Sequence, residues 1–239
     1  GDDWTVDVED VRQPVGGLIV HRGEVVEGQP RPGDRCTAQV DGERRLDITR
    51  NHTATHLLHA VLRQVLGSHV QQRGSLVAPD RLRFDFSHDQ PITPDELDTI
   101  EHEINEAILA NMPVVAVWKD LASARAEGAM ALFGEKYGDV VRMVQIGDGH
   151  FSRELCGGTH VRSTAEIGVF KILSESSSAA NVRRIEAVTG PEAVRLLRER
   201  DALLREAAAE LRATPEQVPA KIAELRKRVK GAAKRGGAD

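Results

Sequence analysis

Two short stretches, His52-Thr53-Ala54-Thr55-His56 and Cys156-Gly157-Gly158-Thr159-His160, decide how this sequence is read. In each stretch, three residues separate two side chains that can bind a metal ion. Residues four apart lie on one face of a helix, so the two histidines of the first stretch can hold one ion from consecutive turns. The two glycines of the second stretch favour a tight loop that brings its cysteine and histidine to the same ion.

Three imidazoles and one thiolate form a ligand set that suits tetrahedral zinc, so we predict His52, His56, Cys156 and His160 as metal ligands. Each pair alone is common in proteins without metal, and only the combination indicates zinc. Metalloproteases also carry His-x-x-x-His on a helix, but they need Glu after the first histidine as general base. Thr53 stands there, which argues against a protease. The residues leave open whether His160 or a water molecule completes the site.

The chain has 239 residues, of which 40% are hydrophobic and 3% aromatic, so it can form one large or two small cores built mainly of aliphatic residues. It has 2 cysteines. Because Cys156 belongs to the metal motif, Cys36 has no cysteine left to pair with, and we expect no disulfide scaffold. We expect Cys36 to be buried as a small hydrophobic side chain. This cysteine usage favours a reducing compartment, and we expect a cytoplasmic protein. No signal peptide or membrane span is visible, and the start at Gly1 without Met suggests a processed piece.

Residues 1–48 read as β-structure. Their apolar runs are short and are interrupted by Gly and Pro, and Asp41-Gly42 is a hairpin turn signal. This pattern predicts part of a small β-barrel, since the segment is short for a closed one.

Residues 49–190 predict an α+β domain whose strands are mostly not separated by crossover helices. Asn51 is a suitable N-cap for a helix that Gly67 stops. Thr93-Pro94-Asp95-Glu96 is a capping box that opens another long helix, which ends before Pro113. The other expected elements are strands at 81–86, 114–118, 140–146, 169–173 and 182–188, and a short helix at 121–126.

Residues 191–239 predict helices. Leu197, Leu204 and Leu211 recur every seven residues, and Thr214-Pro215-Glu216-Gln217 is a capping box that opens a second helix. The pattern fits an αα-hairpin or a coiled coil, through which chains could self-associate, and it fits a plain amphipathic surface helix equally well. This part holds twelve basic and eight acidic residues, whereas the whole chain has a net charge of -5. Contact with a polyanion is therefore expected from local patches and from this part.

Six stretches that follow one another between about residue 8 and residue 190 resemble a known family. They are Arg50–His59, Gln72–Leu76, Leu82–Phe86, Gly128–Tyr137, Glu154–His160 and Val182–Glu186. Together they resemble the editing domain of the alanyl-tRNA synthetases. The related threonyl type typically carries Pro at the position of Thr159 and another residue in place of Gly157, so the alanyl type is the better match.

The resemblance implies three parts: the end of a β-barrel (1–48), an aminoacyl-tRNA deacylase or editing domain (49–190) and a helical hairpin toward an absent C-terminal domain (191–239). It implies one Zn²⁺ per chain and hydrolysis of Ser-tRNA(Ala) and Gly-tRNA(Ala), the cis-editing part of alanine-tRNA ligase. ATP and Mg²⁺ would serve only the aminoacylation domain, which is absent here. Editing is needed because a pocket shaped for alanine cannot exclude glycine and rejects serine only weakly.

Further residues are catalytic candidates. Gln72 matches a family position that helps to recognise the misplaced amino acid, since an amide can bond to a serine hydroxyl. A solvated loop glutamine is the alternative. Gly157 and Gly158 let backbone N–H groups approach the ester oxygen, although a tight turn needs the same glycines. Thr159, the next residue of the same loop, is a catalytic candidate as well. Thr55 faces away from both histidines of its helix, and we expect it to pack.

The expected partner is the acceptor end of tRNA(Ala) carrying Ser or Gly. We do not expect the chain to bind a membrane. Arg183 and Arg184 point to opposite faces of a strand, so one can meet the tRNA while the other forms an ion pair. Arg73 and Lys171 are weaker candidates for phosphate contacts, and a solvated charge is the default for each. Two other functions stay open: a free-standing trans-editing deacylase, and a zinc-stabilised RNA-binding module without activity.

Overall fold

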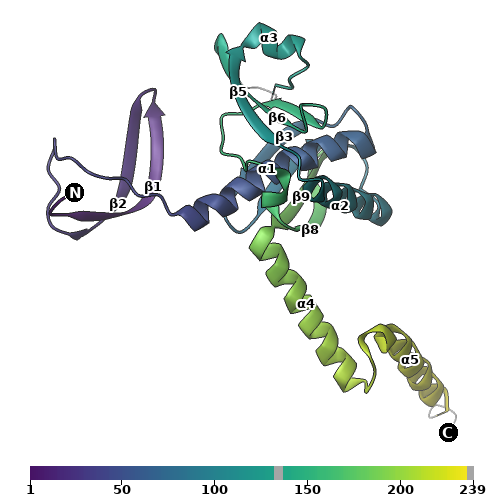
Figure 1. Cartoon of the computed structure of the whole chain (residues 1–239). Coiled ribbons are helices and arrows are strands. Elements are labelled where there is room, and N and C mark those ends of the chain that lie inside the picture. Colours follow the sequence, from purple (N-terminus) through teal and green to yellow (C-terminus); the bar gives the residue numbers. More distant parts are fainter. Residues whose placement is uncertain (132–136, 236–239) are drawn as a thin grey trace. The chain divides into compact units, whose positions relative to one another are not determined.

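The computed structural model describes residues 1–131 and 137–235, the last five as backbone only. The chain divides into two compact units, Gly1–Gly42 and Glu43–Asp239. The predicted α+β class is confirmed, because helices are combined with antiparallel sheets (Figure 1). The assignment of functions to the three predicted parts of the chain stays a prediction.

In the first unit, β1 (Thr5–Val15) and β2 (Leu18–Glu27) form a two-stranded antiparallel sheet. The turn between them contains Gly17, whose φ of 80° lies in the left-handed region that favours glycine. All residues of this unit are described, and β1 and β2 are its only strands. Two strands do not form a barrel by themselves, so the partial barrel remains a prediction. Cys36, which we expected to be buried, is exposed because it lies in the irregular segment 28–41, which forms no sheet over it.

The second unit combines two antiparallel sheets with helices. The strands of the larger sheet have the order β3-β4-β9-β8 and span Gln72–Val77, Leu82–Ser87, Val182–Thr189 and Phe170–Ala179. The strands of the smaller sheet have the order β5-β6-β7 and span Val114–Asp120, Val140–Ile146 and Ser152–Leu155. The helices of this region are α1 (Gly42–Leu66), α2 (Pro94–Leu109), α3 (Leu121–Ala126) and the short 3-10 helix η1 (Thr164–Ile167).

Helices α1 and α2 share one hydrophobic core with one face of the larger sheet. Leu82, Phe84 and Phe86 alternate along β4 and are fully buried, as the sequence predicted for this strand. On α2, three isoleucines at helical spacing form the apolar stripe that meets this face. The members of this core from the helices are Leu57, Leu58, Leu62, Ile100, Ile104 and Ile108.

A smaller core lies between α3 and the three-stranded sheet, formed by Ala124, Val141, Met143 and Leu155. The chain leaves it after Leu155 and enters the larger core at Val161. The loop between these two residues, which contains the second predicted metal-binding stretch, therefore runs from one core to the other.

The positions of most predicted elements are confirmed, including α2 with its capping box at Thr93 and the strands β4, β5, β6 and β9. The beginning of α1 was wrongly predicted. This helix starts at Gly42, because the good helix formers at 43–46 extend it backwards, so Asp41-Gly42 is no hairpin turn and Asn51 is no N-cap. Strands β3 and β7 were not predicted.

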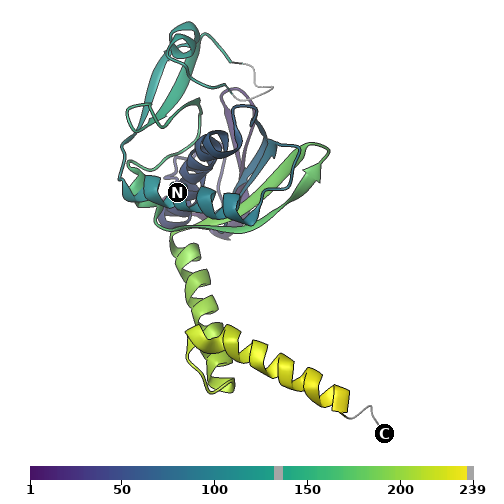
Figure 2. The ribbon, with the colours of Figure 1, turned by 90° about the vertical axis from the view of Figure 1, so that its right-hand side faces the viewer.

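Helix α4 (Gly190–Glu210) is followed by the 3-10 turn η2 (Pro215–Gln217) and by α5 (Val218–Arg235). The capping box at Thr214 that opens the second helix is confirmed. The two helices pack only around their connection, and Figure 2 shows that they diverge from it instead of forming a closed hairpin. None of the described helices has the length and apolarity needed to cross a membrane.

Asn51 is buried in the middle of α1, where its side chain joins three parts of the fold. Its Nδ2 donates to the carbonyl oxygens of Ala78, at 2.8 Å, and Pro79, at 3.3 Å. Its Oδ1 accepts a hydrogen bond of 2.8 Å from the hydroxyl of Thr189, at the end of β9. Asn51 and Thr189 are buried, and Ala78 and Pro79 are half-buried, so the amide satisfies polar atoms to which water has little access.

We expect Asn51→Ala to lower the free energy of unfolding by about 2–3 kcal/mol, because buried partners lose their hydrogen bonds. Denaturant unfolding of the full chain measures this loss. Thr189→Val should cost less, and the double variant should lose less than the sum of both changes, since the second substitution removes a group that is already unpaired. Fully additive losses would contradict this account.

Candidate metal centre

The four predicted ligands lie together. One nitrogen or sulfur atom from each of His52, His56, Cys156 and His160 lies within 4.8 Å of the others. Cys156 Sγ is 3.4 Å from His52 Nε2, and the imidazole centroid of His160 is 4.4 Å from that of His52 and 4.9 Å from that of His56. The structure thus brings together two stretches that are far apart in sequence, at a distance that one ion can bridge.

The elements around the cluster hold its two halves in place. Strand β7 ends at the buried Leu155 and so delivers Cys156 next to α1. Arg142 on β6 fixes the loop that follows, because its Nη1 donates to the carbonyl oxygens of Cys156, at 2.9 Å, and Gly158, at 2.7 Å. On the opposite side, the hydroxyl of Thr49 is 3.2 Å from that of Thr159.

The two glycines of the loop differ in their surroundings. A Cβ atom at Gly158 would overlap the imidazole ring of His52, whereas one at Gly157 would meet open space. The N–H group of Gly158 donates to Cys156 Sγ over 3.5 Å. Gly158 is therefore required for the close approach of the loop to His52, and its N–H already faces the sulfur.

Two residues that the sequence analysis did not assign to the site contact the histidines. Glu154 Oε2 is 2.9 Å from His56 Nδ1, and its Oε1 is 3.2 Å from His59 Nδ1. Thr53 Oγ1 is 3.2 Å from His160 Nδ1. Spacing gives no sign of the link to Glu154, because the carboxylate and the histidines come from separate parts of the chain.

The polar atoms of the cluster fit a metal ion. His160 Nε2 is buried and has no hydrogen-bond partner among the described residues. Burial opposes ionisation of Cys156, but the imidazoles of His160, His52 and His56 outweigh it and lower the pKa of the thiol to about 3. Burial lowers the pKa of His160 to about 4. A thiolate and a neutral imidazole are the forms that bind metal, and zinc suits this set of nitrogen and sulfur donors.

His56 and Glu154 form a buried ion pair in the protein without metal. Burial opposes protonation of His56, but the negative charge of Glu154 prevails and raises the pKa of the imidazole. Burial likewise opposes ionisation of Glu154, and the charge of His56 keeps the pKa of this carboxyl below its usual value. The carboxylate is therefore charged, and its Oε2 faces the imidazole of His56.

The remaining candidate residues lie on the larger sheet. Gln72 is in β3, where its amide donates to Ser75 Oγ at 3.1 Å, so it is not a loop residue. Arg73 is exposed on the same strand. Thr55, by contrast, lies on α1; it is buried and donates to the Asn51 carbonyl at 2.9 Å, in agreement with a packing role.

The basic candidates of strands β8 and β9 form ion pairs within the fold. Arg183 bonds to both carboxylate oxygens of Glu175, at 2.5 and 2.6 Å, and this pair is almost buried. Arg184 bonds to both oxygens of Asp85, at 2.7 and 2.8 Å. Lys171 bonds to Glu101 at 2.5 Å. Within the family-like stretch Gly128–Tyr137, residues 132–136 lie outside the described residues.

Comparison with known proteins places the chain beside translation enzymes. Residues 141–186 match the family described as threonyl and alanyl tRNA synthetase second additional domain. The alanine–tRNA ligase of Geobacillus thermodenitrificans is 54% identical over 95% of this chain and 26% of the ligase. The ligase of Roseiflexus sp. is 53% identical over 93% of the chain and 27% of the ligase, and that of Mesorhizobium japonicum is 48% identical over 94% and 26%. The chain spans about a quarter of the length of these relatives.

We expect the purified chain to contain one metal ion, and Gly158→Ala to weaken its binding by about tenfold or more, because the added methyl group displaces His52. Gly157→Ala is the matched control and should bind the ion as the wild type does, since its methyl group meets open space. Metal analysis after dialysis against a chelator series measures both. Equal affinities of the two variants would show that the contact between Gly158 and His52 does not shape the site.

Proposed function

Since this chain corresponds in sequence to a segment of the alanine–tRNA ligases, we propose that it hydrolyses Ser-tRNA(Ala) and Gly-tRNA(Ala) with one bound zinc ion. The observation that carries the proposal is the group of His52, His56, Cys156 and His160. A structural zinc site of a small domain usually stabilises a fold that lacks a core. Here a large core of aliphatic and aromatic residues is present beside the cluster, which supports a role of the metal in chemistry.

The substrate is an ester of a small amino acid with the tRNA 3′ end. A bound zinc ion supplies a Lewis acid for its carbonyl or a water molecule of lowered pKa. Because the N–H of Gly158 is directed at Cys156 Sγ, the N–H of the exposed Gly157 is the one that can donate to an ester oxygen. Thr159 is in the same loop, and Gln72 would supply an amide for the serine hydroxyl.

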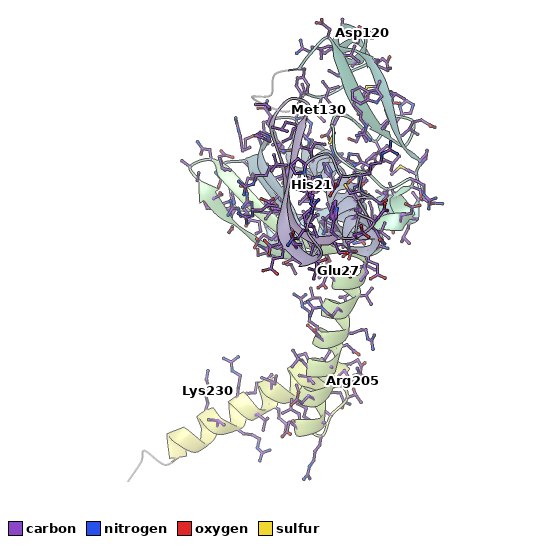
Figure 3. All side chains as sticks on the ribbon, turned by 90° about the vertical axis from the view of Figure 1, so that its left-hand side faces the viewer. His21, Glu27, Asp120, Met130, Arg205 and Lys230 are labelled. Atoms are coloured by element: carbon purple, nitrogen blue, oxygen red, sulfur yellow. The ribbon has the colours of Figure 1, made fainter. Side chains whose placement is uncertain are left out.

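The tRNA requires basic side chains that are accessible. Arg183, Arg184 and Lys171 are held by carboxylates, so we assign them mainly to the fold. Arg73 stays a candidate for a phosphate contact because it is exposed on β3. Helix α5 presents a further group of exposed basic side chains, at Arg226, Lys227, Arg228 and Lys230. Figure 3 shows Lys230 and, on α4, Arg205 projecting from their helices. We propose that α5 contacts the tRNA backbone.

We expect Cys156→Ala to reduce deacylation of Ser-tRNA(Ala) by more than about a hundredfold. The substitution removes a proposed metal ligand, which costs more than the loss of a residue that only hydrogen-bonds to a ligand. Circular dichroism should show that the fold persists, since the larger core does not contain Cys156. Cys36→Ala is the matched control, because Cys36 is exposed and lies in the first unit, and it should retain full activity. Release of serine from labelled Ser-tRNA(Ala) measures the rates.

Three results would revise this proposal in different ways. Full activity of Cys156→Ala would reject the site. Global unfolding of the variant would make the metal structural. A wild-type chain that binds tRNA but releases no amino acid would favour the RNA-binding module over either form of deacylase.

We expect the triple variant Arg226→Gln, Lys227→Gln, Arg228→Gln to bind Ser-tRNA(Ala) more weakly, with the slope of log affinity against log salt shallower by about 2 if all three contact phosphates. Turnover at saturating substrate should stay the same. The matched control is Arg195→Gln with Arg205→Gln, whose guanidinium groups already pair with carboxylates of α4. An unchanged slope in the triple variant would remove α5 from the tRNA interface.

A further inference from the structure

Two buried side chains, Glu154 and Thr53, each contact one of the candidate histidine ligands from behind. Both contacts are made at Nδ1, the ring nitrogen next to the backbone. Glu154 is 1% exposed and Thr53 is fully buried, so neither contact competes with water. Since an imidazole binds metal through one nitrogen while the other makes a hydrogen bond, the partner at Nδ1 decides which nitrogen is the ligand.

The carboxylate of Glu154 is a hydrogen-bond acceptor only. His56 Nδ1 must therefore carry the proton that bridges the 2.9 Å to Oε2, which leaves Nε2 as the nitrogen that gives up its proton when a metal binds. Two further donors fix the carboxylate. His59 Nδ1 is 3.2 Å from Oε1, and the hydroxyl of Ser152 donates to Oε1 at 3.1 Å. His59 in turn packs against the ring of Phe84.

The hydroxyl of Thr53 has one proton to donate. It donates this proton to the carbonyl of Thr49, at 3.0 Å, and accepts from the N–H of Val161, at 3.1 Å. Its contact of 3.2 Å with His160 Nδ1 is then a second accepted bond, which again puts the imidazole proton on Nδ1. The other nitrogen, His160 Nε2, is the buried atom without a hydrogen-bond partner among the described residues.

We propose that Glu154 and Thr53 are positioning residues that hold His56 and His160 with Nδ1 protonated, so that Nε2 of each imidazole binds the metal. The proposal rests on the metal centre of the proposed function. It makes His160 a protein ligand, with no water molecule in its place. It also gives Thr53 a role at the position where a metalloprotease would carry its general base: the short hydroxyl supports a ligand on the opposite loop.

The test uses Co²⁺ as the probe, titrated into the metal-free full chain against a chelator of known affinity. Thr53→Val keeps the shape of the side chain and removes the hydroxyl, and Glu154→Gln keeps the shape and removes the charge. Each should weaken Co²⁺ binding by about 10- to 100-fold, because Thr53→Val removes the acceptor of His160 and Glu154→Gln replaces the charged acceptor of His56 with a weaker, neutral one. Thr53→Ser restores a hydroxyl and should restore most of the affinity. At saturating Co²⁺ the thiolate absorption of Cys156 should be the same in all variants.

Thr55→Val is the matched control for Thr53→Val. It lies on the same helix, is also buried, and bonds only to a carbonyl of its own helix among the contacts that the structure records. Glu101→Gln is the control for Glu154→Gln, because this carboxylate bonds to Lys171 and to the N–H of Ile172 instead of a histidine. Both controls should bind Co²⁺ as the wild type does, whatever they do to the unfolding temperature.

Wild-type affinity in Thr53→Val and Glu154→Gln would overturn the proposal, and so would an equal loss in the controls or a failure of Thr53→Ser to recover. The outcome is separable from that of the proposed function. If the wild type binds Co²⁺ and the variants lose affinity while Ser-tRNA(Ala) is not hydrolysed, only the function is rejected. If the wild type binds no Co²⁺, both the metal centre and this inference are rejected.

Discussion

The structure depends on the enclosure of helix α1, whose residues from Thr53 to His59 are buried on every side. A polar side chain in such a place must find a partner in the protein, because water cannot reach it. Asn51 therefore fixes the segment at Ala78 and the end of β9, Thr53 fixes the loop at Val161, and His56 meets Glu154. The polar residues of one helix thus set the positions of segments that come from three other parts of the chain.

This enclosure explains which parts of the fold and the site the sequence could predict. Residue type and spacing were sufficient to select the four side chains that the fold brings together and the capping box at Thr93, because both patterns are local. They failed for Asn51, since asparagine suits a helix cap and a buried bridge equally well, and only the fold decides between them.

The arginines of β9 and the carboxylate near the cluster were harder to predict for a related reason. Alternation along a strand placed Arg183 and Arg184 on opposite faces, but their acidic partners come from β8 and β4, and that pairing is not visible in the sequence. Glu154 shows the same limit. It lay inside a stretch that resembled the family, yet its role requires knowing that β7 ends beside α1. Chemistry that depends on contacts between distant segments appears only in the folded chain.

The loop that leaves the smaller core at Leu155 and enters the larger one at Val161 also sets an order of assembly. His52 and His56 come onto one face as soon as α1 forms, which for a helix takes a microsecond or less by general estimates, about 0.1–1 μs. Cys156 follows His52 by 104 residues, so its arrival requires the pairing of β6 with β7 and closure of a long stretch of chain. Formation of α1 alone thus aligns His52 with His56, whereas the cluster of four side chains also needs the contact between α1 and the loop after β7.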